Sequence, residues 1–498
     1  MIPAPVWRAC RPRPAHAFRI GKLNRTVPLV LAVALFMENM DSTVISTSLP
    51  AIAADIGSNP ITLKLALTSY YVALAIFIPI SGWMADRFGA RRVFRGAILV
   101  FVAGSVACAA SASLAEFVGA RFMQGMGGAM MTPVARLVLV RSTPRSALVS
   151  AMAWLAVPAL VGPVVGPPVG GFITTFFSWH WIFLINVPIG LAGVAVAGRV
   201  LPDMPPVSVG RIDWPGFFLA AVASAGIVFG LSVVSLPALP PAVGLATLLL
   251  GAAAAFLYVR HARRTPGPIL DLRLLRQPAP RIAIASGMLF RIGSGAVPFL
   301  LPLLFQIGFG LTPFASGMLT FATALGSIAL KFIASAMLRL MGFRNVLILA
   351  SLSGAALIAA NALFTSATPH WVIIAVLVAA GITRSLYFTA SNALVFAEID
   401  DREASQATAI AAVSQQISIA LGVAVAGIFL EAHHFFTGEE TGPSAFFVAF
   451  IGVAAVAACS ALPTLRLAPD AGRSVSGHRA GHAASGGTDT ETRPQSAE

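Results

Sequence analysis

The chain has 498 residues, of which 57% are hydrophobic and only 10% are charged. Soluble domains carry about a quarter charged residues, so the composition excludes an ordinary soluble fold and indicates a protein whose main solvent is lipid. A net charge of +14 would suit a nucleic-acid partner, but the basic residues gather in alternate connections between apolar runs, as in the cytoplasmic loops of membrane proteins. We therefore expect a lipid bilayer, and no nucleic acid, as the partner.

Apolar stretches long enough to cross a bilayer recur from about residue 27 to about residue 465. A span needs about 20 apolar residues, and long uninterrupted runs exclude the alternating pattern of a membrane β-barrel. We predict an all-α polytopic membrane protein with fourteen transmembrane helices. In chain order they are expected near 27–48, 64–84, 94–113, 116–139, 147–174, 182–200, 213–234, 241–260, 281–307, 312–336, 344–364, 371–396, 405–430 and 444–465.

The distribution of Lys and Arg predicts that both termini are cytoplasmic. Numbering the spans from an N-terminus inside leaves only Lys64 on the outer side. The first apolar run carries carboxylates and no cleavage site follows it, so we expect it to remain as the first helix and not to be removed as a signal peptide. The longest basic connection, 260–281, is expected to be a cytoplasmic connector between two lobes.

The first span holds the only carboxylates expected in the membrane interior, Glu38 and Asp41. A spacing of three places both on one helical face. Two negative charges so close together in a low dielectric would not both persist, so the pair is suited to exchange a proton near neutral pH. Structural pairing of these carboxylates with a buried cation is the alternative that the sequence leaves open.

The connection between the second and third spans combines glycines with charged residues. Gly89 allows a tight turn between antiparallel helices, and Asp86 can accept hydrogen bonds from a helix N-terminus or an arginine. A plain basic loop that orients the protein is the alternative. The positions concerned are Gly82, Asp86, Arg87, Gly89, Arg91 and Arg92.

The fourth span places Arg121, followed one turn later by Gln124, inside the membrane. An intramembrane charge costs several kcal/mol unless it is paired or hydrated, and such residues are commonly functional. Because Arg121 cannot release its proton, we expect it to act on a neighbouring carboxylate. Snorkelling of Arg121 to the outer interface is the alternative.

The fifth span is unusually dense in helix breakers. In lipid, glycine faces allow helices to approach closely, and neighbouring groups satisfy the backbone atoms that proline frees. A packing kink without meaning for transport would explain the pattern on its own. The positions are Gly162, Pro163, Gly166, Pro167, Gly170 and Gly171.

The second half of the chain adds three intramembrane cations, Arg291, Lys331 and Arg384. Lys331 lies close enough to the cytoplasmic side to snorkel. Together with Gln124 these residues are candidates for lining a substrate cavity. Counting Arg121, four buried cations face two buried carboxylates, so two cations need carbonyls, water or a ligand as counterpart. We expect the cavity to tolerate substrates with an anionic or strongly accepting group.

These motifs together resemble the fourteen-helix drug:proton antiporter branch of the major facilitator superfamily. The 82–92 connection is similar to that superfamily's signature loop, the string at Arg121 to its helix-4 motif, and the Gly/Pro string to its antiporter motif, which is characteristic of exporters. Asp41-x-Thr43 with Leu49-Pro50 resembles the branch's helix-1 motif, in which Ser46 replaces a usual Asn. The second-half counterpart of the signature loop, 339–344, lacks the Asp.

The resemblance implies roles for these residues and an organisation for the chain. The 82–92 residues would form a cytoplasmic latch between the lobes, and Arg121 would take part in proton transfer with Glu38 and Asp41. The implied organisation is a basic tail (1–26), a six-helix lobe (27–200), two extra helices with linkers (201–280), a second six-helix lobe (281–467) and a disordered cytoplasmic tail (468–498).

The function expected is proton-coupled export of small amphipathic molecules by alternating access, as in multidrug efflux, across a bacterial inner membrane. A proton-coupled importer of the same fold is the first alternative, and a membrane enzyme or transporter-like sensor the second. No nucleotide-binding string occurs, and we expect no cofactor besides the proton gradient. Cys10, Cys108 and Cys459 have no metal-ligand spacing, and His433-His434 beside Glu431 is expected to be a solvated outer loop, so no metal is predicted. The protein is expected to act as a monomer, with a periplasmic adaptor as a candidate partner.

Overall fold

The computed structural model describes residues 26–144, 147–204, 206, 210, 212–234, 240–330, 333–399, 403–438 and 442–473. The predictions for the tails at 1–25 and 474–498, and for Lys331, lie outside these residues. The described residues form helices and no strand. The helices are α1 (Thr26–Val44), η1 (Ile45–Thr47), α2 (Leu49–Asp55), α3 (Lys64–Phe88), α4 (Ala90–Ala109), α5 (Leu114–Ser142), α6 (Leu148–Phe176), α7 (Trp181–Leu184), α8 (Asn186–Val200), α9 (Trp214–Val234), α10 (Pro241–Arg264), η3 (Leu272–Arg276), α11 (Pro278–Leu303), η4 (Leu304–Gly308), α12 (Pro313–Ala329), α13 (Ala334–Ala360), η6 (Asn361–Leu363), α14 (His370–Phe396), α15 (Ala404–Thr437), α16 (Pro443–Ala458) and α17 (Ala461–Leu465).

Eleven helices of the described chain are long and apolar enough to cross a membrane. The expectation of an all-α polytopic membrane protein is therefore confirmed at this level. Three further predicted spans, 116–139, 147–174 and 312–336, fall on α5, α6 and α12, which are not among the eleven. The prediction of one helix through residue 336 was wrong, because α12 ends at Ala329 and α13 begins at Ala334. The residues between them are largely apolar, so hydropathy does not mark this end.

Two turns depend on a glycine with positive φ. Gly89, with φ of 90°, joins α3 to α4, and Gly342, with φ of 72°, interrupts α13. Side chains with a Cβ atom rarely adopt this backbone conformation. Gly342 therefore permits a kink in α13 of the second half, as Gly89 permits the turn between α3 and α4 in the first, although the acidic residue of the first turn has no counterpart there.

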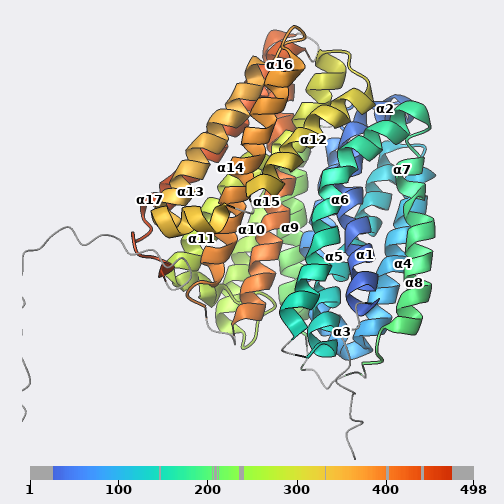
Figure 1. Ribbon diagram of the computed structural model, residues 1–498, viewed down its shortest axis with the longest axis vertical. Helices are drawn as coiled ribbons and strands as arrows, with labels where there is room; N and C mark the ends of the chain where they lie inside the picture. The colour runs from blue at the N-terminus through green and yellow to red at the C-terminus, as the bar shows by residue number, and fades with distance from the viewer. Residues whose placement is uncertain are drawn as a thin grey trace, which may run out of the picture.

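The long helices pack as two groups with a hairpin between them (Figure 1). Helices α1, α3, α4, α5, α6 and α8 contact one another, as do α11 to α16. The groups meet where α6 packs on α12 and where α3 packs on α15. In the α9–α10 hairpin, α9 packs against both α3 and α15.

Three apolar clusters form the core. One lies within the first group, and a small one joins α3, α9 and α15 through Ile76, Phe217, Val228 and Ala420. The largest holds the second group together and also includes residues such as Leu49 from the ends of α1, α2 and α3. We call the end that carries α2 and the start of α3 the Lys64 end, and the opposite end, with the α3–α4 turn, the Gly89 end. The largest cluster thus ties the two groups at the Lys64 end.

Candidate functional site

A buried polar network centred on Asp41 lies inside the first group. Asp41 Oδ2 accepts a hydrogen bond from Arg121 Nη1 at 2.7 Å, and Asp41 Oδ1 accepts from Gln124 Nε2 and Asn186 Nδ2, both at 2.8 Å. Ser105 Oγ accepts a further bond from Gln124 at 2.8 Å. Asp41 and Arg121 are each 1% exposed. One cation and two amides therefore bind the carboxylate, and the Asp41 side chain is almost fully buried.

Four elements build this network. Arg121 and Gln124 are one turn apart on α5 and so share a face, while α1, α4 and α8 contribute the other members. The guanidinium carbon of Arg121 also lies 4.4 Å from the centre of the Tyr70 ring on α3, a cation–π distance. Snorkelling of Arg121 is excluded, because its side chain is buried and paired. The sequence left open that the carboxylates pair with a buried cation. Asp41 does so, with Arg121 as the cation.

Glu38 makes its hydrogen bond outside this network. Its Oε2 accepts a hydrogen bond from Thr132 Oγ1 of α5 at 2.9 Å, and its side chain is partly exposed. The two carboxylates lie on one helix, three residues apart, and bind different partners. Asp41 is the neutralised, enclosed member and Glu38 is the accessible one.

A second buried ion pair joins the two groups at the Lys64 end. Lys64 Nζ of α3 lies 2.9 Å from Glu431 Oε1 of α15, and the Lys64 side chain is fully buried. Two predictions bear on this pair: a helix that begins at Lys64, which agrees with α3, and an outer loop at Glu431, which was wrong. The reason for the second is that α15 continues to Thr437, so His433 and His434 are also helical. No group of three or more residues suited to hold a metal occurs among the described residues.

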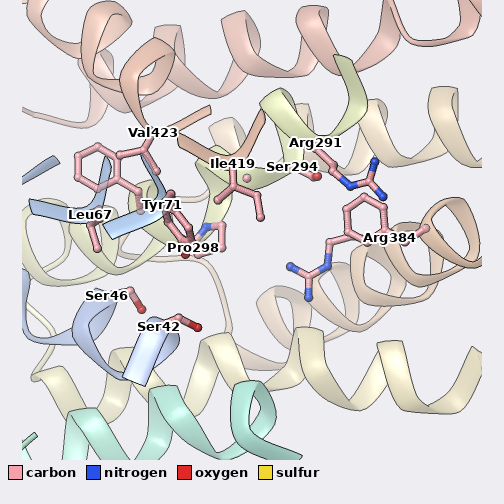
Figure 2. Close-up of a pocket in the computed structure, with 13 residues that line it drawn as sticks. Ser42, Ser46, Leu67, Tyr71, Arg291, Ser294, Pro298, Arg384, Ile419 and Val423 are labelled. Atoms are coloured by element: carbon pink, nitrogen blue, oxygen red, sulfur yellow. The ribbon is translucent and has the colours of Figure 1, made fainter. Parts of the chain in front are cut away.

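A pocket of about 140 Å³ lies between the two groups (Figure 2). Helix α1 and η1 contribute serines and α3 contributes apolar residues, while α11, α14 and α15 line the other side. Figure 2 shows Arg291 and Arg384 apart from Leu67, Tyr71 and Val423. The lining residues are Ser42, Ser46, Leu67, Tyr71, Arg291, Ser294, Gly295, Pro298, Phe299, Arg384, Phe388, Ile419 and Val423. Of the candidate cavity residues, Arg291 and Arg384 line this pocket, whereas Gln124 belongs to the buried network.

The charged connection at the Gly89 end makes contacts within the first group. Asp86 Oδ1 lies 2.7 Å from Arg141 Nη2 at the end of α5, and Arg91 donates a hydrogen bond to the Gly198 carbonyl of α8. Gly89 approaches the carbonyl of Met204. Both the ion pair and the Arg91 bond therefore brace α3 and α4 against neighbours of the same group.

The glycines of α6 permit close contacts with both groups. A methyl group at Gly166 or Gly170 would collide with α1, and one at Gly171 with the backbone of Pro313 at the start of α12. Gly317 of α12 approaches the Pro167 carbonyl in the same way. The Gly/Pro string is thus the surface on which α6 meets α1 on one side and α12 on the other. Gly162, Pro163 and the rest of the string extend this surface along α6.

Sequence reasoning missed Asn186 and Ser105 as members of these sites, and it missed the pairing of Lys64 with Glu431. Asn186 is a lone amide in an apolar run, WIFLINVP, and that isolation was the available signal. Ser105 carries no such signal, because serines are frequent throughout the chain. Lys64 is the first residue of its predicted helix and Glu431 lies just beyond the predicted end of the other helix, so the sequence did not indicate that the two pair.

Comparisons with known proteins agree with this arrangement. The sequence matches the family description "Major Facilitator Superfamily" over residues 31–270 and 283–489. It is 36% identical over 444 residues to the "Putative multidrug resistance protein MdtD" of Serratia proteamaculans, covering 89% of this chain and 93% of the relative. It is also 36% identical over 428 residues to the "Probable transport protein HsrA" of Haemophilus influenzae, covering 86% and 92%.

Solved structures show the same fold at low sequence identity. A D-xylose-proton symporter aligns with a TM-score of 0.65 at 15% identity, covering 90% of this chain and 98% of that one. The POT family transporter PepTSo aligns with a TM-score of 0.66 at 14% identity, covering 89% and 98%. With the family match spanning most of the sequence and the relatives aligned over nearly their whole length, the chain belongs to the major facilitator superfamily.

Proposed function

We propose that this protein is a proton-coupled antiporter that exports small amphipathic molecules, a multidrug efflux transporter and not an enzyme. The observation that carries the proposal is the enclosed Asp41–Arg121 pair on α1 and α5, one residue away from Ser42 in the pocket lining. A titratable group that adjoins the pocket on the same helix can couple its proton to what the pocket holds. The names of the MdtD relatives support drug efflux as the outcome.

The proposed coupling depends on the charge balance of the network. When Asp41 is ionised, Arg121 is neutralised and α1 is held against α5. Protonation of Asp41 removes that attraction and leaves a buried cation, which is costly in a low-dielectric interior. The helix that lines the pocket with Ser42 and Ser46 is then free to shift. Glu38, which is partly exposed, is the proposed route by which a proton reaches Asp41.

Alternating access is supported by the contacts at the Lys64 end. Besides Lys64–Glu431, Gln306 Nε2 donates to the Thr47 carbonyl at 2.9 Å, and the Phe314 amide donates to Thr175 Oγ1 at 3.0 Å. Each of these bonds joins the first group to the second. They would close the Lys64 end while the pocket communicates with the other side, and would break when the transporter reverses.

The proposed topology has fourteen spans with both termini cytoplasmic, in a bacterial inner membrane. The α9–α10 hairpin then supplies the two helices of 201–280 between lobes 27–200 and 281–467, and the Gly89 end faces the cytoplasm. The connection with Asp86, Arg87, Arg91 and Arg92 acts as a latch there. We propose a functional monomer that needs no cofactor besides the proton gradient, with a periplasmic adaptor as a candidate partner.

The direction of transport is tested in everted membrane vesicles. Export predicts that an imposed pH gradient, acid inside, drives uptake of a fluorescent drug into these vesicles, and that Asp41→Asn abolishes it. Accumulation in right-side-out cells under a gradient that is acid outside would instead favour the importer. A transporter-like sensor predicts no gradient-driven flux in either preparation. A susceptibility screen in an exporter-deficient host, comparing the wild type with Asp41→Asn, then identifies the drugs.

A further inference from the structure

The charged residues that line the pocket between the two groups are all positive. Two guanidinium groups, Arg291 of α11 and Arg384 of α14, are among its lining residues, and no carboxylate is. Both lie within helices that are expected to cross the bilayer, where an uncompensated charge is costly. Their counterpart must come from a neighbouring side chain, from water or from a ligand.

Neighbouring side chains of the described chain do not neutralise these cations. Arg291 Nη2 donates to Asn392 Oδ1 at 2.9 Å, and its guanidinium carbon lies 5.0 Å from the centre of the Phe388 ring. Both partners are uncharged. Arg384 makes no hydrogen bond or ion pair with any described residue. By contrast, Arg121 has a carboxylate at 2.7 Å.

The carboxylates of the adjacent helix are engaged elsewhere. Asp41 is bound by Arg121 and two amides, and Glu38 accepts from Thr132. The part of α1 and η1 that reaches the pocket presents Ser42 and Ser46. In this conformation the pocket therefore has two cations and neutral polar groups, with no negative group of its own.

The remaining lining is apolar or aromatic and includes Leu67, Tyr71, Phe299, Ile419 and Val423. Ligand sites commonly combine such a surface with a few polar groups that fix orientation. A ligand that fits this pocket has a compact apolar or aromatic body and a group that two guanidinium ions can hold. Carboxylates match the planar fork of arginine donors better than other common groups do.

We propose that the pocket selects amphipathic organic carboxylates over neutral and cationic analogues, with Arg291 and Arg384 holding the carboxylate. This inference rests on the proposed function, because it names the substrate class of the same transporter. A bound carboxylate supplies the missing counter-charge, whereas a lipophilic cation would add a third positive charge to the pocket. The selectivity therefore includes repulsion of the cation as well as attraction of the anion.

Binding to the purified full-length protein in detergent tests this, with three probes that share one ring system: 1-naphthylacetate, 2-(1-naphthyl)ethanol and 2-(1-naphthyl)ethylammonium. Isothermal titration calorimetry is expected to show the carboxylate bound about tenfold or more tighter than the alcohol, as one charge-assisted hydrogen bond would give. The ammonium probe should bind most weakly. Arg291→Gln and Arg384→Gln should each remove most of this preference.

Two matched variants keep the test decisive. Arg199→Gln makes the same charge change on the exposed surface of α8 and should leave the preference intact. Arg384→Lys retains the charge and should retain part of the preference, which decides the matter even if a glutamine variant does not fold. Equal or tighter binding of the ammonium probe, or a preference that survives both glutamine substitutions, would overturn the proposal.

These measurements need no proton gradient, so they separate the two proposals. Carboxylate selectivity without gradient-driven flux in vesicles would remove the exporter and leave the ligand class standing. Gradient-driven efflux of cationic dyes by a protein without carboxylate selectivity would support the exporter and remove the proposed ligand class.

Discussion

At the scale of single residues, the most consequential feature is that Asp41 is almost fully buried and accepts hydrogen bonds from three side chains. Arg121, Gln124 and Asn186 all bind its carboxylate. The sequence identified Asp41 and Arg121 as candidates because charges are rare in apolar runs. It did not join them, since 80 positions separate them and only the packing of α1 on α5 brings them together.

Replacing Asp41 with Asn should separate proton coupling from substrate binding. The amide keeps the size of the side chain but carries no titratable proton, so gradient-driven transport should fall to background. Substrate exchange at equal pH on both sides should persist in proteoliposomes, because it needs no net proton movement. Loss of both activities together, with the purified variant still folded, would show that Asp41 serves the structure and not the coupling.

The cost of an unpaired buried charge gives a second prediction at this scale. Asp41→Ala and Arg121→Ala should each destabilise the protein by about 3–5 kcal/mol, because each leaves one charge buried alone. The double substitution should cost less than the sum of the two, since it removes both charges. Thermal unfolding of the four proteins in one detergent measures the difference. Additive effects would mean that the two side chains do not depend on one another.

At the scale of elements, the contacts that matter most lie between helices far apart in sequence. Lys64 on α3 and Glu431 on α15 are 367 positions apart. Hydropathy located both helices but ended the second near residue 430, which left Glu431 in a loop. A buried charge at the edge of an apolar run has the same hydropathy as a solvated one, so its pairing could not be predicted.

Neutralising this pair should open the Lys64 end. Glu431→Gln combined with Lys64→Met removes the attraction between α3 and α15, and a cysteine at position 306 reports on access there. In a background without native cysteines, labelling by a membrane-impermeant maleimide should rise about tenfold, the effect of a charge-assisted bond of about 1.4 kcal/mol. The exchanged pair, Lys64→Glu with Glu431→Lys, should restore slow labelling. Identical labelling in all three proteins would rule out a role for the pair in closure.

The glycine surface of α6 gives a prediction about packing. Gly171→Ala places a methyl group against the Pro313 backbone of α12, so it should lower stability by about 1–3 kcal/mol, the usual cost of overpacking. Gly96→Ala on α4 is the matched control, because a methyl group there meets nothing within 4 Å. Melting temperatures in detergent compare the two. A Gly171→Ala protein as stable as the control would show that α6 and α12 separate without cost.

At the scale of the whole molecule, the order and type of the elements followed from hydropathy, because a lipid solvent demands long apolar helices. The contacts between the two groups could not be predicted from hydropathy. The Gly89 turn was predicted from its sequence, and its repeat at Gly342 was expected only as a degenerate copy. The pocket was anticipated through Arg291 and Arg384, but its serines from α1 and η1 had no separate signal.

The fourteen-span topology can be tested by labelling single cysteines in whole cells. Pro240→Cys, between α9 and α10, should react with an impermeant maleimide from outside, whereas Gly267→Cys, after α10, should react only after lysis. This pattern requires that both helices of the hairpin cross the membrane. Reaction of both positions only after lysis would mean that the hairpin does not cross.

The position of α9 has a consequence for how lipid-dissolved molecules reach the centre of the protein. Helix α9 fills the seam between α3 and α15, with Phe217 and Val228 packed into it, while α10 lies behind α9. The seam between α6 and α12 is on the other flank, where the hairpin does not pack. The hairpin thus covers the flank at the α3–α15 seam and leaves the flank at the α6–α12 seam uncovered. A molecule that diffuses within a leaflet can therefore reach the α6–α12 seam directly, but it reaches the α3–α15 seam only past the hairpin.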